Sequence, residues 1–114
     1  MDSTRLFKAL SDITRLRCLS LLTNADELCV CELTQAMSIA QPKVSHHLAA
    51  LRKAGLVTDR KEGLWIHYRI NETLPQWVYD VIQIAAKGIS QEEPYVTDAA
   101  ALDEVRNSTK NICG

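Results

Sequence analysis

The stretch QPKVSHHLAALRKAG, residues 41–55, decides the fold together with LVTDRKEGLWIHYRI, residues 56–70, which follows it directly. The first part has apolar side chains at helical spacing and ends in Gly55, a residue that commonly closes a helix. The second part is rich in β-branched and aromatic residues around Gly63, which favours a strand, a turn and a second strand. The two parts therefore predict a helix over residues 41–54 that is followed by a β-hairpin.

The segments around this stretch complete a mostly helical order of elements. Ser11-Asp12 can cap a helix that begins at Ile13, because the carboxylate of Asp12 can accept hydrogen bonds from the first backbone N–H groups. Pro75 is placed to open a later helix. In chain order, the expected segments are a helix over 3–10, a helix after Asp12, a loop over 23–26 with Asp26 as a cap, a short helix over 32–37, a tight turn over 38–40, the helix over 41–54, the hairpin, a helix over 75–89 and a short helix near 98–106.

This order of elements predicts a mostly α fold with a small β-hairpin, the winged helix-turn-helix. A length of 114 residues fits one domain, and 46% apolar residues are enough to bury a core. Residues 1–106 are expected to form a DNA-binding and dimerisation domain, and residues 107–114 a flexible C-terminal tail.

Composition argues against several classes of protein. The longest apolar stretches are far shorter than the ~20 residues of a membrane-spanning helix. The N-terminus has no basic segment that leads into an apolar one, as a secretory signal does. We therefore expect a cytoplasmic protein with no membrane partner, whose four cysteines are reduced thiols. An enzyme is not expected, because no nucleophile–base pair, glycine-rich phosphate loop or carboxylate pair in an apolar setting is visible.

Charge is distributed unevenly along the chain. The net charge is −1, but residues 41–69 carry six Lys or Arg against two carboxylates, a local net charge of +4. A basic segment within an acidic protein is typical of a nucleic-acid footprint, although the same charges can also lie on an ordinary solvated face.

The outer face of the helix over 41–54 has the polar and small side chains that suit base edges in the major groove of DNA. A rotation of about 100° per residue puts His46 on this face and His47 on the inner one, where we expect a satisfied core or capping histidine. The hairpin adds two cations for backbone or minor-groove contact. The candidate DNA-binding residues are Gln41, Pro42, Lys43, Ser45, His46, Arg60 and Lys61.

A single reading helix contacts few base pairs, so we expect a homodimer on double-stranded DNA. The helix over 75–89 has more apolar residues than one buried stripe needs, and the first helix adds others. These residues form either a dimer interface or part of the monomer core. They are Trp77, Val78, Val81, Ile82, Ile84, Ala85 and Ile89, with Leu6, Phe7 and Leu10.

Cys29-Val30-Cys31 is a candidate site for a thiophilic ion, because thiolates are soft ligands. In an ideal helix the two side chains lie about 200° apart, whereas in an extended segment they fall on the same side. Binding of one ion by both is therefore expected to need a deformed helix start, and the alternative is a pair of structural cysteines. Cys18 lies among leucines and is expected in the core, while Cys113 lies in the tail.

Four motifs of the chain resemble the ArsR family of regulators. The motifs are Asp12-Ile13-Thr14-Arg15-Leu16, Glu27-Leu28-Cys29-Val30-Cys31-Glu32-Leu33, Gln41-Pro42-Lys43-Val44-Ser45-His46-His47-Leu48 and Asp59-Arg60-Lys61-Glu62-Gly63. The resemblance implies a dimeric repressor of an arsenic-resistance operon that requires no cofactor. Its inducer, As(III) or Sb(III), would bind Cys29 and Cys31 and release the operator.

One position departs from the pattern of these repressors. Their third cysteine, in Cys-x-Cys-x-x-Cys, is replaced here by Thr34, whose hydroxyl is a poor soft ligand. The third donor is then Cys113, Cys18, a small thiol or water, or it is absent.

Other functions remain open at this point. Oxidation of the thiols, or another thiophilic metal, could be the signal in place of arsenic. A winged helix that only binds other proteins would show undetectable or salt-insensitive DNA binding, because phosphate contacts make affinity fall steeply with salt.

Overall fold

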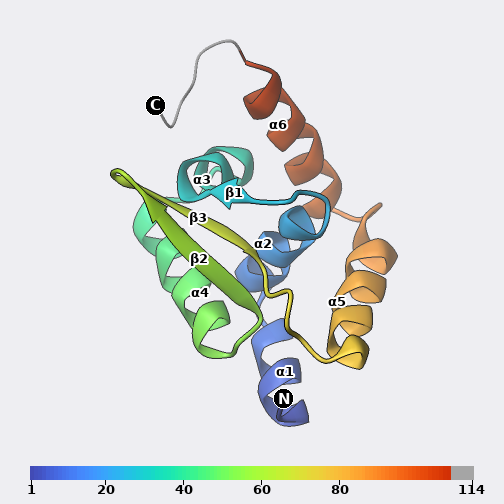
Figure 1. Ribbon diagram of the computed structural model, residues 1–114. Helices are drawn as coiled ribbons and strands as arrows, with labels where there is room; N and C mark the ends of the chain where they lie inside the picture. Colours follow the sequence, from blue (N-terminus) through green and yellow to red (C-terminus); the bar gives the residue numbers. More distant parts are fainter. Residues whose placement is uncertain (109–114) are drawn as a thin grey trace.

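The computed structural model describes residues 1–108, which form six helices and a three-stranded sheet (Figure 1). The helices are α1 (Ser3–Leu10), α2 (Ile13–Thr23), α3 (Val30–Met37), α4 (Gln41–Lys53), α5 (Gln76–Ile89) and α6 (Tyr95–Asn107). The strands are β1 (Leu28–Cys29), β2 (Val57–Glu62) and β3 (Trp65–Ile70). The expected mostly α fold with a small β-hairpin, the winged helix-turn-helix, is confirmed. Cys113 and most of the expected tail lie outside the described residues.

Helix α2 lies at the centre of the molecule, with α5 on one side and α4 with the sheet on the other (Figure 1). Asp12 caps it as expected, because its carboxylate accepts a hydrogen bond of 3.0 Å from the backbone N–H of Arg15. Burying one large aliphatic side chain stabilises the fold by about 1.5–3 kcal/mol. The core contains Leu6, Cys18, Leu22, Leu33, Leu48, Leu56, Val78 and Ile82, all 2% exposed or less.

Strands β2 and β3 form the antiparallel hairpin of the wing. Val57 pairs with Ile70 at the base of the hairpin, and Glu62 pairs with Trp65 beside the turn. Gly63 has φ of +61° at the first of the two turn residues, where a two-residue hairpin turn of this kind calls for glycine. The second turn residue, Leu64, is 89% exposed at the tip of the wing.

The start of α3 differs from the sequence expectation in three connected ways. Strand β1 was not expected; it pairs antiparallel with β3, with Cys29 opposite His67. Helix α3 then begins at Val30, two residues earlier than expected. Its N-cap is Cys29, and the assignment of Asp26 as the cap is wrong. The backbone N–H of Cys29 donates to Glu32 at 2.9 Å, so the carboxylate of Glu32 completes the helix start.

Helix α6 begins at Tyr95, three residues before the expected start, and it is joined to the centre of the molecule by a buried ion pair. The guanidinium group of Arg17 on α2 donates to both carboxylate oxygens of Asp98, at 2.7 and 2.8 Å. It also donates to the carbonyl oxygen of Met37, at 2.9 Å. Asp98 is 3% exposed. One side chain of α2 therefore joins α6 to the end of α3.

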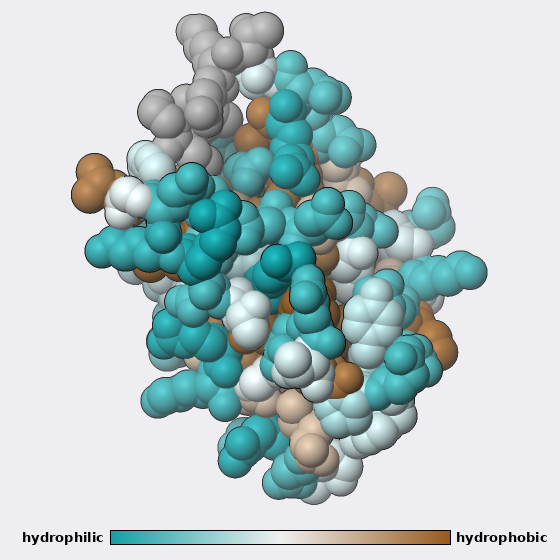
Figure 2. Space-filling view, in the orientation of Figure 1, coloured by the Kyte–Doolittle hydropathy of each residue, from teal (hydrophilic) through white to brown (hydrophobic). Residues whose placement is uncertain are grey.

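The surface carries exposed apolar side chains on α1 and α5. Phe7 is 54% exposed, Trp77 45% and Ile84 71%. Leu6, Val78 and Ile82 are buried in the monomer core, so these three members of the expected dimer surface are core residues. The face in Figure 2 is mostly hydrophilic, with an apolar group protruding where the wing ends. Within residues 1–108, no helix has the length and apolar character needed to cross a membrane.

The ion pair that holds α6 generates a prediction about stability. Replacing Asp98 by Ala leaves the guanidinium of Arg17 without its carboxylate, and Arg17 is largely buried. We expect the free energy of unfolding to fall by about 2–4 kcal/mol, as measured by urea denaturation. Asp103→Ala, at an exposed position of the same helix, is the control and should change it by less than about 0.5 kcal/mol. Equal effects of the two changes would contradict the prediction.

Candidate nucleic-acid interface and thiol site

The first turns of α4 present the predicted reading face to solvent. Gln41, Lys43 and His46 are exposed, and Ser45 is half-buried. Pro42 lies in the first turn, where its lack of an N–H costs the helix nothing. The side-chain amide of Gln41 donates to the hydroxyl of Ser45 at 2.9 Å. These five residues lie together, and their contact with bases remains a prediction.

His47 occupies the inner side of α4, as expected. Its Nδ1 lies 3.5 Å from the carboxylate of Asp12 and 3.3 Å from the guanidinium of Arg15. Burial lowers the pKa of His47, and the nearby carboxylate of Asp12 opposes that shift. His47 therefore packs α4 against the start of α2 and does not face outward with His46.

Arg60 does not extend from the tip of the wing. Its guanidinium group reaches back to the segment before β1 and donates to both oxygens of Glu27, at 2.6 and 2.8 Å. It also donates to Glu62 at 3.2 Å, and His67 lies between the two carboxylates. This pairing holds the pKa of Glu27 below its usual range. Of the two cations predicted on the hairpin, only Lys61 lies outside an ion pair within residues 1–108.

The same pattern holds for the whole basic segment. Its three arginines each form an ion pair, Arg52 with Asp59, Arg60 with Glu27 and Arg69 with Glu72. Exposed ion pairs of this kind add little to the stability of the fold, but each one weakens the electrostatic attraction between its arginine and a phosphate group. The lysines of the segment have no ion-pair partner in the described part of the chain; they are Lys43, Lys53 and Lys61.

The two cysteines of the Cys-x-Cys motif converge where β1 passes into α3. Their Sγ atoms lie 2.6 Å apart. The backbone of Cys29 is extended, with φ −72° and ψ 147°, and the helix begins one residue later. Of the helical and extended arrangements that the sequence left open, the extended one is present at Cys29, and the strand-to-helix junction turns both side chains to one place. Binding of one ion by the pair stays a prediction.

Burial decides the acidity of the Cys29 and Cys18 thiols. Cys29 stands at a helix N-terminus, where backbone N–H groups favour the thiolate, yet burial outweighs them and raises the pKa of Cys29. Burial raises the pKa of Cys18 to about 12, and this residue is 0% exposed in the core, as expected. Cys18 is therefore a poor choice as a third ligand.

The described residues supply no third soft donor beside the pair. The hydroxyl of Thr34 donates to the carbonyl oxygen of Val30, one turn earlier in α3. Within residues 1–108, no group of three or more His, Cys, Asp or Glu side chains is placed to hold a metal ion. Cys113, the predicted third ligand, lies outside these residues.

Two carboxylates of this region were not identified from the sequence. Glu32 binds the backbone N–H of Cys29 and also pairs with Arg106 of α6, at 3.2 Å. The spacing of Cys29 and Glu32 is that of a capping box with cysteine at the cap, which is the signal that could have revealed it. Glu27 gives no comparable local signal, because its partner Arg60 lies 33 residues away.

Comparison with known proteins identifies the family. Residues 12–59 match the family described as "Bacterial regulatory protein, arsR family". The arsenical resistance operon repressor of Escherichia coli (strain K12) is 41% identical over 109 residues, which cover 96% of this chain and 93% of that protein. The chain belongs to the ArsR family. The arsenic resistance transcriptional regulator ArsR1 of Pseudomonas putida is 52% identical over 101 residues, 87% of this chain and 76% of the relative.

Solved structures of ArsR-type regulators share the fold. HlyU from Vibrio cholerae N16961 superposes with a TM-score of 0.67 at 36% identity, over 78% of this chain and 92% of that one. The AntR antimony-specific transcriptional repressor superposes with a TM-score of 0.63 at 32% identity, over 77% of each chain. This ArsR-family protein is therefore a winged-helix transcriptional regulator that binds DNA, and it is not an enzyme.

The opposite positions of the two neighbouring histidines generate a prediction about DNA binding. His46→Ala removes an exposed side chain from the reading face and should raise the operator dissociation constant about 10-fold or more. His47→Ala removes contacts inside the fold; it should lower stability by about 1–2 kcal/mol and change that constant less than about 3-fold. Fluorescence anisotropy with labelled operator DNA, at one fixed salt concentration, measures both. Equal losses of affinity in two folded variants would show that the assignment is wrong.

Proposed function

We propose that this ArsR-family regulator represses an arsenic-resistance operon and that As(III) or Sb(III) releases it from the operator by binding Cys29 and Cys31. The observation that carries the proposal is the 2.6 Å separation of the two sulfur atoms at the start of α3. The arsenic-resistance relatives and the antimony-specific AntR support the choice of inducer. The protein acts in the cytoplasm and needs no bound cofactor.

The chemistry at the two thiols is a ligand exchange without oxidation. With both cysteines in the reduced form, each thiol loses its proton and replaces one hydroxide on As(III), so two As–O bonds break, two As–S bonds form and two water molecules leave. Thiolates are soft donors and suit this thiophilic element. Because burial keeps Cys29 protonated, arsenic displaces a proton that the empty site retains.

Ligation at this place acts on the joint between the wing and the reading helix. Cys29 is the last residue of β1, which pairs with β3 of the wing, and Cys31 lies in the first turn of α3. Helix α3 leads through the turn at Ser38 into α4. An arsenic atom bonded to both sulfurs therefore changes the relation of the two DNA-binding elements. A coupling free energy of about 1–3 kcal/mol suffices for a useful switch.

The proposed repressor works as a homodimer on a palindromic operator. One α4 reads too few base pairs for strong specificity, and a second copy doubles the contacts. The exposed apolar side chains Phe7, Trp77 and Ile84 are the described candidates for the surface that two copies share.

The thiol pair generates the main test of this function. In Cys29→Ser and Cys31→Ser the operator affinity should stay close to native, while the arsenite concentration for half release should rise about 10-fold or more. A gel shift with increasing arsenite measures both. Cys18→Ala is the matched control, because it removes a thiol that is buried in the core, and it should release as the native protein does. Serine variants that bind DNA and release at the native arsenite concentration would refute the site.

Cys113 is the proposed third ligand for inorganic As(III), and the arsenic K-edge absorption spectrum tests it. We expect three sulfur neighbours of arsenic in the native protein and two in Cys113→Ser. Cys29→Ser is the comparison variant: it removes one proposed sulfur ligand of the pair, and its sulfur count is compared with that of Cys113→Ser. An unchanged sulfur count in Cys113→Ser would assign the third position to another donor.

Thiol oxidation is the second candidate, and the convergence of the same two sulfurs favours it. Hydrogen peroxide would accept two electrons from the two thiols, giving one disulfide and two water molecules. Adjacent-but-one cysteines form a strained disulfide, which places this function behind arsenic binding. Release of the operator by peroxide, without release by arsenite, would favour oxidation.

A further inference from the structure

The tip of the wing exposes three consecutive apolar side chains. Leu64, the second residue of the turn, is 89% exposed, Trp65 is 41% exposed and Ile66 39%. Gly63 supplies the positive φ of the turn, so the turn geometry does not call for an apolar residue at Leu64. Single exposed leucines are common on protein surfaces, so the role of this one depends on what lies beside it.

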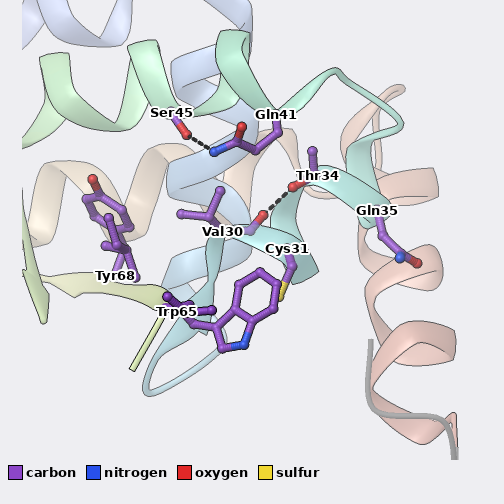
Figure 3. Close-up of a pocket in the computed structure, with 10 residues that line it drawn as sticks. Val30, Cys31, Thr34, Gln35, Gln41, Ser45, Trp65 and Tyr68 are labelled. Atoms are coloured by element: carbon purple, nitrogen blue, oxygen red, sulfur yellow. Dashed lines mark hydrogen bonds between the residues drawn. The ribbon is translucent and has the colours of Figure 1, made fainter. Parts of the chain in front are cut away.

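The wing tip and the reading helix border the same hollow. A cavity of about 640 Å³ lies between the wing, α3 and the start of α4 (Figure 3). Leu64 and Trp65 line it from the wing, and Gln41 and Ser45 line it from α4. Figure 3 shows Gln41 and Ser45 on one side of this space and Trp65 on the other. The apolar tip therefore lies beside the reading face and not on a remote surface.

The charges near the tip are divided between the two faces of the wing. Asp59 and Lys61 point to the same face of β2, because alternate residues of a strand do so. Asp59 accepts a hydrogen bond of 2.9 Å from Arg52 of α4, so this face is turned toward the reading helix. Arg60 and Glu62 point to the opposite face, where they pair at 3.2 Å. Lys61, which has no ion-pair partner within residues 1–108, therefore accompanies the apolar tip on the side of α4.

This arrangement fits two neighbouring grooves of one DNA duplex. With α4 in the major groove, one sugar–phosphate strand separates it from the next minor groove, and the hollow offers that strand room. The minor groove is about 6 Å wide, and leucine is one of the side chains that proteins insert into it. The floor of a G·C pair carries the amino group of guanine, which an A·T pair lacks. Covering that donor with an apolar side chain costs its hydrogen bond to water.

We infer that Leu64 enters the minor groove beside the base pairs that α4 reads and selects A·T over G·C there. Lys61 contacts a phosphate at the edge of that groove. Leu64 is then a residue that determines sequence specificity through an apolar contact. The inference rests on DNA binding, which the family establishes, and is independent of the inducer.

The test uses a base analogue that differs from guanine by one amino group. A duplex isolated from a random-sequence pool by binding to the native protein serves as the probe. Its hydroxyl-radical footprint, which reports on sugars in the minor groove, locates the pairs beside each half-site. These pairs are then made A·T, G·C or inosine·C, since inosine lacks the amino group and leaves the major groove unchanged. The native protein should bind the G·C duplex about 10-fold more weakly than the other two. Equal affinity for G·C and inosine·C would overturn the inference.

Variants of the tip assign this preference to one side chain. Leu64→Ala should reduce the preference for inosine·C over G·C to about 3-fold or less, because the smaller side chain leaves the amino group accessible to water. Leu64→Met is the matched control; it keeps an apolar side chain and should keep the preference. Both changes are at an exposed position, and thermal unfolding checks that both variants fold. Full preference in Leu64→Ala would show that another residue senses the amino group, and the inference would be wrong.

The salt dependence of binding separates the apolar contact from a phosphate contact. On the A·T duplex, Leu64→Ala should lower affinity about 10-fold and leave the slope of log affinity against log salt unchanged. Lys61→Ala should reduce that slope by about one. Native affinity of Leu64→Ala on all three duplexes would show that the tip does not touch DNA and serves another partner. An equal loss of slope in both variants would show that Leu64 only positions the cation. Either result would overturn the inference.

Discussion

The contacts of one guanidinium group set the arrangement of the helices around the core. Arg17 on the central helix α2 binds the buried carboxylate of Asp98 on α6 and the carbonyl oxygen of Met37 at the end of α3. Desolvation offsets much of the attraction within such a pair. The guanidinium group, the carboxylate and the carbonyl oxygen all have hydrogen-bond partners only when the three helices are arranged in this way, so the network favours one relative position of the helices. The thiol pair at the start of α3 and the reading helix after it both depend on that placement.

The parts of the fold that could be predicted are those whose signals are local. Asp12 caps α2, Gly55 follows the end of α4 and Gly63 occupies the hairpin turn, and each was visible in a few neighbouring residues. Strand β1 was missed because it has two residues and is stabilised by β3, where Leu28 meets Tyr68 across 40 positions of sequence. The start of α3 was misplaced for the same reason, since this pairing extends the chain up to Cys29.

The predictions about the candidate site divide in the same way, into those with a local sequence signal and those that depend on distant parts of the chain. The helical rotation of about 100° per residue separated His46 from His47 correctly. The convergence of Cys29 and Cys31 was expected only if their segment is extended, and the sequence could not decide this, because the convergence depends on one extended residue that meets a helix start. The local net charge of +4 follows from composition alone. In the structure the three arginines are paired with carboxylates, so the positive electrostatic potential of the segment comes mainly from its lysines. Net charge can be summed along a sequence. The electrostatic field at the surface also depends on which carboxylates folding places beside each cation, and these can come from distant parts of the chain.

The cap of α3 has a consequence for the evolution of such a regulator. Cys29 holds a position where serine, threonine or aspartate stabilises a helix by about 0.5–2 kcal/mol over residues that cannot cap, and a thiol is a weak acceptor. A change to serine would strengthen the cap while it removes one sulfur of the proposed arsenic site. Under the proposed function, a single substitution at Cys29 would therefore abolish induction without lowering the stability of the fold. Where arsenic is absent for many generations, permanently silenced operons, and not unfolded repressors, are the expected outcome at this residue.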